Sequence, residues 1–192
     1  DSDNLRVIFP YESVNGELVI IPENKLENEY PKTYSYLLQC KDLLATRDKG
    51  RKEYPAWYAW GRTQAMEAVG PKLLTKTFSK RPMFFQDNSN RLFCNGYGIF
   101  PRGPTLFGPG IPIEVLAIIL NSEVMHYYAK LTCFQIEGDY QCYQKNFIER
   151  FGIVDLTDED VENLVAMSQD QADRYLATLY QVPQEDIDEV LS

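Results

Sequence analysis

Two short apolar runs near the N-terminus predict a β-hairpin. The first run covers residues 6–9 and the second covers residues 18–21. Asn15-Gly16 lies between them and is a pair of residues that favours a tight hairpin turn. Farther along, apolar positions recur at helical spacing over residues 33–47, which predicts an amphipathic helix.

The middle of the chain alternates short apolar runs with turn residues. This pattern predicts strands at residues 73–74, 83–85 and 97–100. The most apolar run follows Pro112, a residue that suits the first turn of a helix. We therefore expect a long buried helix from residue 113 to about residue 128.

The C-terminal part predicts a second hairpin and two capped helices. The hairpin pairs residues 132–134 with 140–143 across a turn. One helix begins at Thr157, a threonine cap with acids in the first turn, and the other begins at Ser168, a capping box of the Ser-x-x-Gln kind. The predicted class is therefore α+β, with short twisted β-sheets, a long buried helix and a C-terminal helical segment. We expect a division into residues 1–154 and an acidic helical segment, residues 155–192.

Composition excludes several classes of protein. The 192 residues are 44% hydrophobic and 24% charged, as in soluble globular proteins, and no apolar run approaches the roughly 20 residues needed to cross a bilayer. We expect a cytoplasmic protein with no membrane partner. The chain begins with Asp1 rather than Met, which suggests a fragment of a longer protein.

The four cysteines do not have the spacing of a metal site or a disulfide scaffold, and His126 is the only histidine. Metal binding is therefore not expected. Cys133 and Cys142 are equidistant from the predicted turn at Glu137-Gly138 and could face each other, but a pair of free thiols is favoured in the cytosol.

Charge is distributed unevenly along the chain. Residues 41–102 contain twelve Lys and Arg against five Asp and Glu, whereas residues 151–192 contain one cation against eleven acids. A basic middle suits phosphate binding, and the acidic tail would have to point away from such a ligand.

Motifs for independent catalysis are missing. The sequence has no Gly-rich phosphate loop of the Walker or Rossmann type and no serine nucleophile elbow. A single histidine leaves little scope for acid–base chemistry. We therefore predict no catalytic residue in this chain.

The most informative segment mixes aromatic rings with cations. Residues 57–64 read Trp-Tyr-Ala-Trp-Gly-Arg-Thr-Gln, and Gly70-Pro71-Lys72 follows. Such a mixture can hold a polyanion and offer flat faces to bases. The alternative is that both tryptophans belong to a core and Arg62 is an ordinary surface charge.

Several motifs in this order resemble one protein family. They are Ile8-Phe9-Pro10-Tyr11, Tyr30-Pro31, Tyr36-Leu37-Leu38, Leu43 to Asp48, Pro55-Ala56-Trp57-Tyr58, Gly61-Arg62-Thr63-Gln64, Gly70-Pro71-Lys72-Leu73, Leu120-Asn121-Ser122, Tyr127-Tyr128, Tyr143 to Asn146 and Phe151-Gly152-Ile153. Together they make the chain resemble the TaqI-like C-terminal specificity domain, or target-recognition domain, of adenine-specific DNA methyltransferases. The likeness is greatest to the type IIG restriction-modification enzymes.

The resemblance implies a DNA-reading fragment. Residues 1–154 would be the target-recognition domain and would bind double-stranded DNA. A separate catalytic methyltransferase domain of the same protein would bind S-adenosylmethionine and methylate N6 of adenine. The motifs of that domain are absent here, so no cofactor is expected in this fragment, and whether the parent also cleaves DNA stays open.

Candidate DNA contacts lie in the basic region. Arg62 is the first choice, as a phosphate clamp or a reader of guanine, although it could instead form a salt bridge that braces Gly61. Lys72 could contact DNA or be a surface lysine. The loop cations Lys49, Arg51 and Lys52 suit phosphate contact, although such charge runs are often only solvated.

Four further residues complete the predicted interface. Lys76, Lys80 and Arg81 are expected to be groove-side cations. Trp60 could stack on a displaced base, since enzymes that modify bases extrude them, whereas Trp57 is expected to anchor the fold. A single positive face formed by the cations of residues 41–102 would support DNA binding, and scattered cations would contradict it.

A different class of function stays open. The chain could be a protein-interaction module whose acidic C-terminal helices contact a partner subunit. A partner complex without DNA binding at low salt would favour this alternative.

Overall fold

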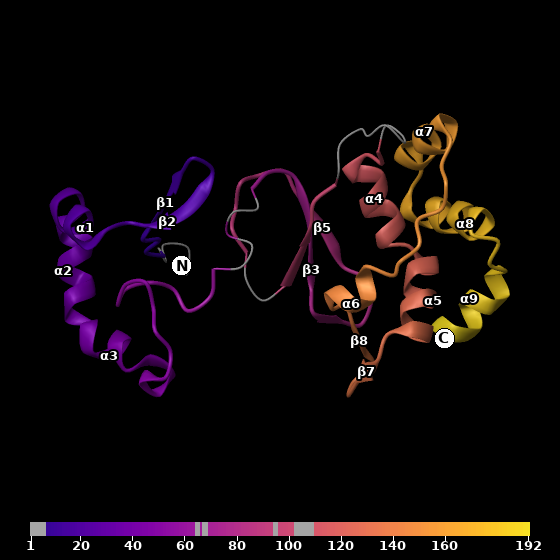
Figure 1. Ribbon diagram of the computed structural model, residues 1–192. Coiled ribbons are helices and arrows are strands. Elements are labelled where there is room, and N and C mark those ends of the chain that lie inside the picture. The colour runs from indigo at the N-terminus through magenta and orange to yellow at the C-terminus, as the bar shows by residue number, and fades with distance from the viewer. Residues whose placement is uncertain (1–6, 64–65, 67–68, 94–95, 102–109) are drawn as a thin grey trace, which may run out of the picture. The chain divides into compact units, whose positions relative to one another are not determined.

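The computed structural model of the chain describes residues 7–63, 66, 69–93, 96–101 and 110–192. The chain divides into two compact units, residues 1–68 and 69–192, which we call the N-terminal unit and the C-terminal unit. Both contain helices and small antiparallel sheets (Figure 1), so the predicted α+β class is confirmed. The predicted division at residue 154 is a functional one and stays a prediction.

The N-terminal unit begins with a hairpin of β1 (Tyr11–Val14) and β2 (Glu17–Ile20). Its turn is the predicted Asn15-Gly16, and both residues have positive φ, 53° and 86°. The turn pairs Val14 with Glu17, so the partner of β2 must be residues 11–14. The prediction that residues 6–9 form the first strand was therefore wrong for residues 7–9, and Arg6 lies outside the described residues.

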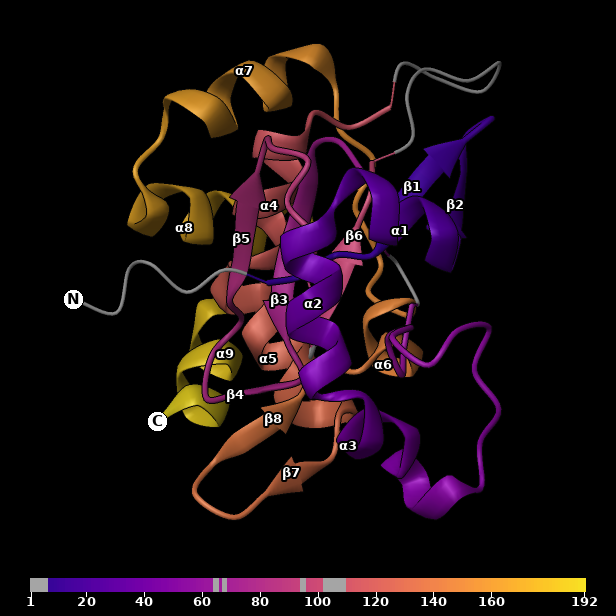
Figure 2. The same ribbon diagram turned by 90° about the vertical axis from the view of Figure 1, so that its left-hand side faces the viewer.

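Three short helices follow instead of the single helix predicted over residues 33–47. They are α1 (Glu23–Glu29), α2 (Pro31–Gln39) and α3 (Lys41–Ala45), and a 3₁₀ turn, η1, covers Arg47–Gly50 (Figure 2). The break falls at Cys40, whose backbone (φ −102°, ψ 3°) leaves helical geometry. The core of this unit consists of Ile21, Leu26, Leu37 and Tyr58.

The C-terminal unit contains a sheet with the strand order β5-β3-β6. Its strands are β3 (Lys72–Lys76), β5 (Phe84–Asp87) and β6 (Gly96–Ile99), all antiparallel to their neighbours. They match the predicted strands to within a few residues.

A second sheet has the order β4-β8-β7. It consists of β4 (Phe78–Ser79), β7 (Gln135–Ile136) and β8 (Tyr140–Cys142) (Figure 2). The predicted turn is confirmed, with positive φ at Gly138 and Asp139. Cys133 and Cys142 are buried free thiols, as the sequence favoured.

The long buried helix predicted from residue 113 is in fact two helices, α4 (Ile113–Leu120) and α5 (Glu123–Thr132). Asn121 causes the break. Its side-chain amide accepts a bond from Phe84 N (2.8 Å) and donates to Phe84 O (2.9 Å) and to Ala117 O (2.8 Å). Ser122 then caps α5 by accepting from Met125 N. Both residues are structural: they end one helix and start the next.

The remaining helices are α6 (Lys145–Ile148), α7 (Asp158–Ala166), α8 (Gln169–Leu179) and α9 (Gln184–Leu191). The predicted capping box at Ser168 is present, and the predicted threonine cap at Thr157 also forms a capping box, with Asp160. Helix α9 was missed, although Pro183 and two acids in the first turn are start signals that the sequence contains.

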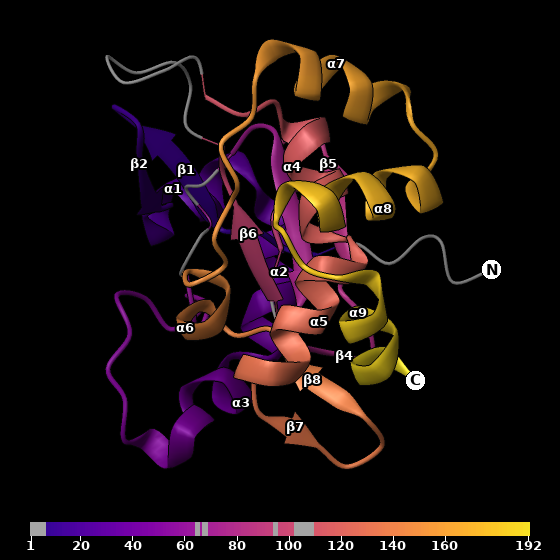
Figure 3. The same ribbon diagram turned by 90° about the vertical axis from the view of Figure 1, so that its right-hand side faces the viewer.

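These elements form layers in the C-terminal unit. Helices α4 and α5 lie between the β5-β3-β6 sheet on one side and α7, α8 and α9 on the other (Figures 1 and 3). One hydrophobic core joins the layers, with Leu73 and Phe84 from the sheet, Ile119 from α4 and Leu176 from α8. The acidic C-terminal helices are therefore part of this unit's core.

Candidate nucleic-acid interface

One arginine holds the basic loop, residues 47–53, against the aromatic segment of the N-terminal unit. The Arg47 guanidinium donates to the carbonyls of Leu44 (2.7 Å), Ala59 (2.7 Å) and Trp57 (2.9 Å). It also lies 4.4 Å from the centre of the Tyr54 ring. A guanidinium suits this position because its donors form a rigid fork. Arg47 is thus a structural residue that sequence reasoning did not single out.

A lysine brings the basic loop next to Arg62. Lys52 Nζ donates to Gly61 O at 2.8 Å and lies 5.0 Å from the centre of the Tyr54 ring. The Tyr54 hydroxyl in turn donates to the Asp48 carboxylate. Residues 48, 49 and 50 all have positive φ, so the loop turns sharply here. The loop and the 61–62 segment are therefore joined by contacts within one unit.

Four predicted DNA-binding residues lie on the basic loop and on the 61–62 segment that Lys52 contacts. Lys49, Arg51, Lys52 and Arg62 are all exposed, and Arg62 forms no hydrogen bond or ion pair with the part of the chain that the structure describes. Over residues 41–63 there are six cations and three acids. This surface can attract a polyanion, and we call Lys49, Arg51, Lys52 and Arg62 the basic patch.

A groove of about 390 Å³ lies beside the basic patch. The β1–β2 hairpin forms one wall and residues 52–63 form the other. The lining includes three aromatic rings and two charged side chains, namely Tyr11, Tyr54, Trp60, Lys52 and Glu53. The groove therefore places apolar surface next to the cations.

The two tryptophans are held by their own unit. Trp60 Nε1 donates to Ile8 O (3.0 Å), and its ring packs edge-on against Phe9 at a centroid distance of 5.4 Å. Trp57 Nε1 donates to Glu23 (2.9 Å), which holds the pKa of that carboxyl below its usual range. Trp57 therefore anchors the fold, as expected. The contacts of Trp60 are also structural, and its stacking on a base stays a prediction.

The structure corrects the prediction for Lys72. Its side chain is fully buried, and Nζ contacts Asp87 Oδ2 (3.3 Å), Gly70 O (3.2 Å) and Ser89 O (2.7 Å). Hydrogen bonds from Ser89, together with the Lys72 ammonium, lower the pKa of Asp87. An ammonium enclosed in this way cannot reach a phosphate, so Lys72 is a structural residue.

The other cations predicted in the C-terminal unit diverge. Lys80 Nζ lies 5.7 Å from the Tyr140 ring of β8, and Arg81 reaches Glu123 of α5 at 3.5 Å. Lys76 instead lines a groove on the sheet. All three are exposed, and their role as groove-side cations stays a prediction, as does the single positive face expected for residues 41–102. Arg102 lies outside the described residues.

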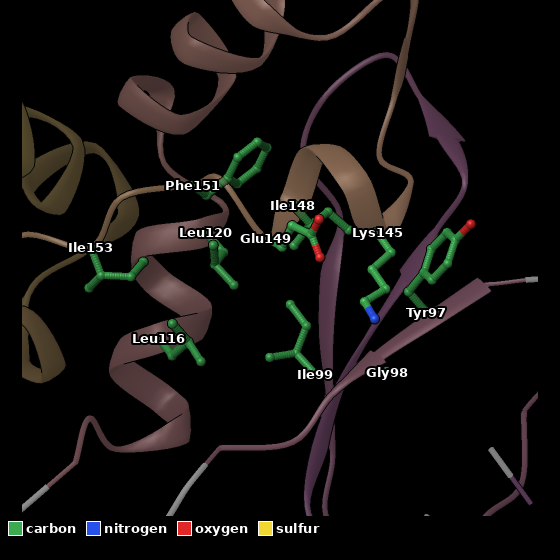
Figure 4. Close-up of a pocket in the computed structure, with 10 residues that line it drawn as sticks. All are labelled: Tyr97, Gly98, Ile99, Leu116, Leu120, Lys145, Ile148, Glu149, Phe151 and Ile153. Atoms are coloured by element: carbon green, nitrogen blue, oxygen red, sulfur yellow. The ribbon is translucent and has the colours of Figure 1, made fainter.

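An apolar pocket of about 360 Å³ lies between β6, α4 and α6 (Figure 4). Ile99, Leu116 and Leu120 form much of its wall, and Lys145 and Glu149 are its charged residues. None of the predicted DNA-binding residues lines it.

The described residues form neither a metal site nor a membrane-spanning helix. Within the described ranges, no group of three or more His, Cys, Asp or Glu side chains could hold a metal ion. Across the same residues, the helices are too short or too polar to cross a membrane.

No protein-family model matches this sequence, and no curated protein matches it either.

Proposed function

We propose that this chain is the sequence-specific DNA-recognition part of an S-adenosylmethionine-dependent adenine-N6 DNA methyltransferase. The basic patch of the N-terminal unit would contact the phosphates of double-stranded DNA. The observation that supports this most is the bond from Lys52 to Gly61, because it joins the basic loop to Arg62. The ordered series of motifs that resembles TaqI-like specificity domains supports the same proposal.

Chemistry would come from elsewhere in the proposed protein. A catalytic domain of the same polypeptide would bind the cofactor and carry out methyl transfer. This chain would fix the register on the duplex through phosphate contacts and select the site through base contacts. Arg62 would be the principal contact within the patch.

Binding to duplex DNA tests the proposal. Fluorescence anisotropy of a labelled duplex should show affinity that falls steeply with salt, since each neutralised phosphate adds about 0.9 to the slope of log K against log salt concentration. Arg62→Ala should weaken binding and lower that slope by about 1. Lys32→Ala is the matched control, since Lys32 is an exposed lysine of the same unit outside the patch. Unchanged affinity and site preference in Arg62→Ala would count against the proposed role of Arg62.

A protein-interaction module remains the second candidate. Exposed acids are concentrated on α7, α8 and α9, and Val165 on α7 is 59% exposed. These helices could meet a basic partner subunit. Isolation of such a complex, together with no DNA binding at low salt, would favour this function over DNA recognition.

A further inference from the structure

The sheet of the C-terminal unit has one face that its helices leave uncovered. Leu73 and Phe84 point into the core beneath α4 and α5, whereas Leu74 and Phe85, which are direct cross-strand partners, lie on the other face. Phe85 is 65% exposed and Met83 is 49% exposed. Figure 3 shows α4 and α5 on the covered side of this sheet. We call the other side the outer sheet face.

A groove of about 270 Å³ follows the outer sheet face. Two aromatic rings, Phe85 and Phe93, line it together with Leu74 and Met83, whereas Tyr97 pairs with Thr75 and directs its side chain to the covered face. Lys76 is the one charged residue among the lining residues that the structure describes. Among the described lining residues, the groove therefore combines apolar and aromatic surface with a cation and no carboxylate.

A glycine of β6 positions Phe93, one of the rings that line this groove. A Cβ atom at Gly98 would lie 2.6 Å from Cζ of Phe93, closer than side chains tolerate. The absence of a side chain at Gly98 lets the Phe93 ring lie against the backbone of β6. Figure 4 shows Tyr97 at the margin of the neighbouring apolar pocket, with its hydroxyl directed away from Leu116. Tyr97 lines both cavities.

We propose that the outer sheet face binds an unpaired nucleotide, with the base stacked on Phe85 and the phosphate beside Lys76. This inference rests on the proposed DNA-binding function and adds a site for unstacked bases. Exposed aromatic rings on a sheet accept bases of any sequence, and a neighbouring cation holds the backbone. The contacts of Trp60 within its own unit make Phe85 the more accessible stacking residue. The single cation and the absence of a carboxylate among the described lining residues favour an anionic ligand over a peptide.

The test compares a strand that has bases with one that lacks them. The probes are a labelled oligothymidylate and an abasic strand of the same length, bound to the 192-residue chain at low salt. Phe85→Leu should weaken oligothymidylate binding about tenfold and leave the abasic strand unaffected, since stacking is what the substitution removes. Lys76→Gln should weaken the binding of both strands, the oligothymidylate and the abasic one. Phe134→Leu is the control, an aromatic residue of the same unit that is 48% exposed outside the groove.

The outcomes separate this inference from the proposed function. Equal effects of Phe85→Leu on both strands, or no effect on either, would overturn the stacking site while salt-dependent duplex binding through Arg62 could still hold. Absence of binding to duplex and single strands would overturn both. Self-association that depends on Phe85, without oligothymidylate binding, would assign the face to protein contact and overturn the inference. Equal thermal midpoints of Phe85→Leu and the wild type ensure that a loss of binding reflects the groove.

Discussion

His126 predicts how the stability of the C-terminal unit depends on pH. Its side chain is 6% exposed, and neither ring nitrogen has a hydrogen-bond partner among the described residues. Burial lowers the pKa of His126 from 6.5 to about 4, and the positive charges of Arg81 and Lys130 act in the same direction. The backbone of Lys80 raises the pKa of His126 and so offsets part of this decrease, although neither ring nitrogen forms a hydrogen bond with it. The folded protein therefore holds this ring neutral where the unfolded chain would bind a proton.

The sign and the size follow from proton linkage. Between the two pKa values the unfolded state binds more protons, so the free energy of unfolding falls as pH falls below 6.5 and levels off below about 4. At 1.36 kcal/mol per pH unit the loss between about pH 7 and about pH 5 is about 2 kcal/mol, and about 1 kcal/mol if solvent screens half of it. Carboxylates with lowered pKa, such as Asp87 and Asp160, stay ionised over this interval.

Urea unfolding at a series of pH values measures this effect. His126→Gln keeps a polar side chain of similar size but does not titrate, so its unfolding free energy should change less between about pH 7 and about pH 5. The informative quantity is the difference between the two pH profiles, because other groups titrate alike in both proteins. Identical profiles would refute the assignment of this proton linkage to His126.

Three further substitutions test structural roles. Lys72→Met should lower the thermal midpoint by roughly 5–10 °C, because Asp87 is left without its buried partner. The salt dependence of DNA binding should stay unchanged, and a smaller salt slope would restore Lys72 as a DNA contact. Asn121→Ala should lower the unfolding free energy by about 2 kcal/mol, since two backbone groups of Phe84 lose their partner; faster hydrogen exchange at the Phe84 amide would locate the effect, and unchanged exchange would contradict it. Arg47→Lys should destabilise the N-terminal unit by about 1–3 kcal/mol and alter tryptophan fluorescence, because an ammonium cannot reproduce the three hydrogen bonds to carbonyls. An unaltered fluorescence spectrum would argue against the structural role of Arg47.

Local signals in the sequence predicted turns and helix starts best. Asn15-Gly16, Thr157 and Ser168 all act as expected, because their conformations depend on residues close in sequence. Helix continuity was predicted less well. The break at Asn121 depends on bonds to Phe84, which lies 37 residues earlier in the chain, and no local pattern contains that information.

The same distinction applies to the candidate site. Charge and exposure of the basic loop follow from its composition, so Lys49, Arg51 and Lys52 could be selected from sequence. The burial of Lys72 could not, since it depends on Asp87 and Ser89 from a neighbouring strand and its turn. The exposure of Phe85 could not be predicted from sequence either, because a strand pattern alone does not tell which face of a sheet a second layer covers.

Asn121 also has a consequence for aggregation. The outer edge of a sheet carries backbone groups that can template pairing with another chain, and proteins protect such edges in several ways. Here one amide side chain from a helix end occupies both backbone groups of Phe84 on β5. A single residue thus blocks one edge at the point where strand addition would begin, without a bulge, a proline or an additional strand. Variants of Asn121 should therefore be watched for fibril growth as well as for lost stability.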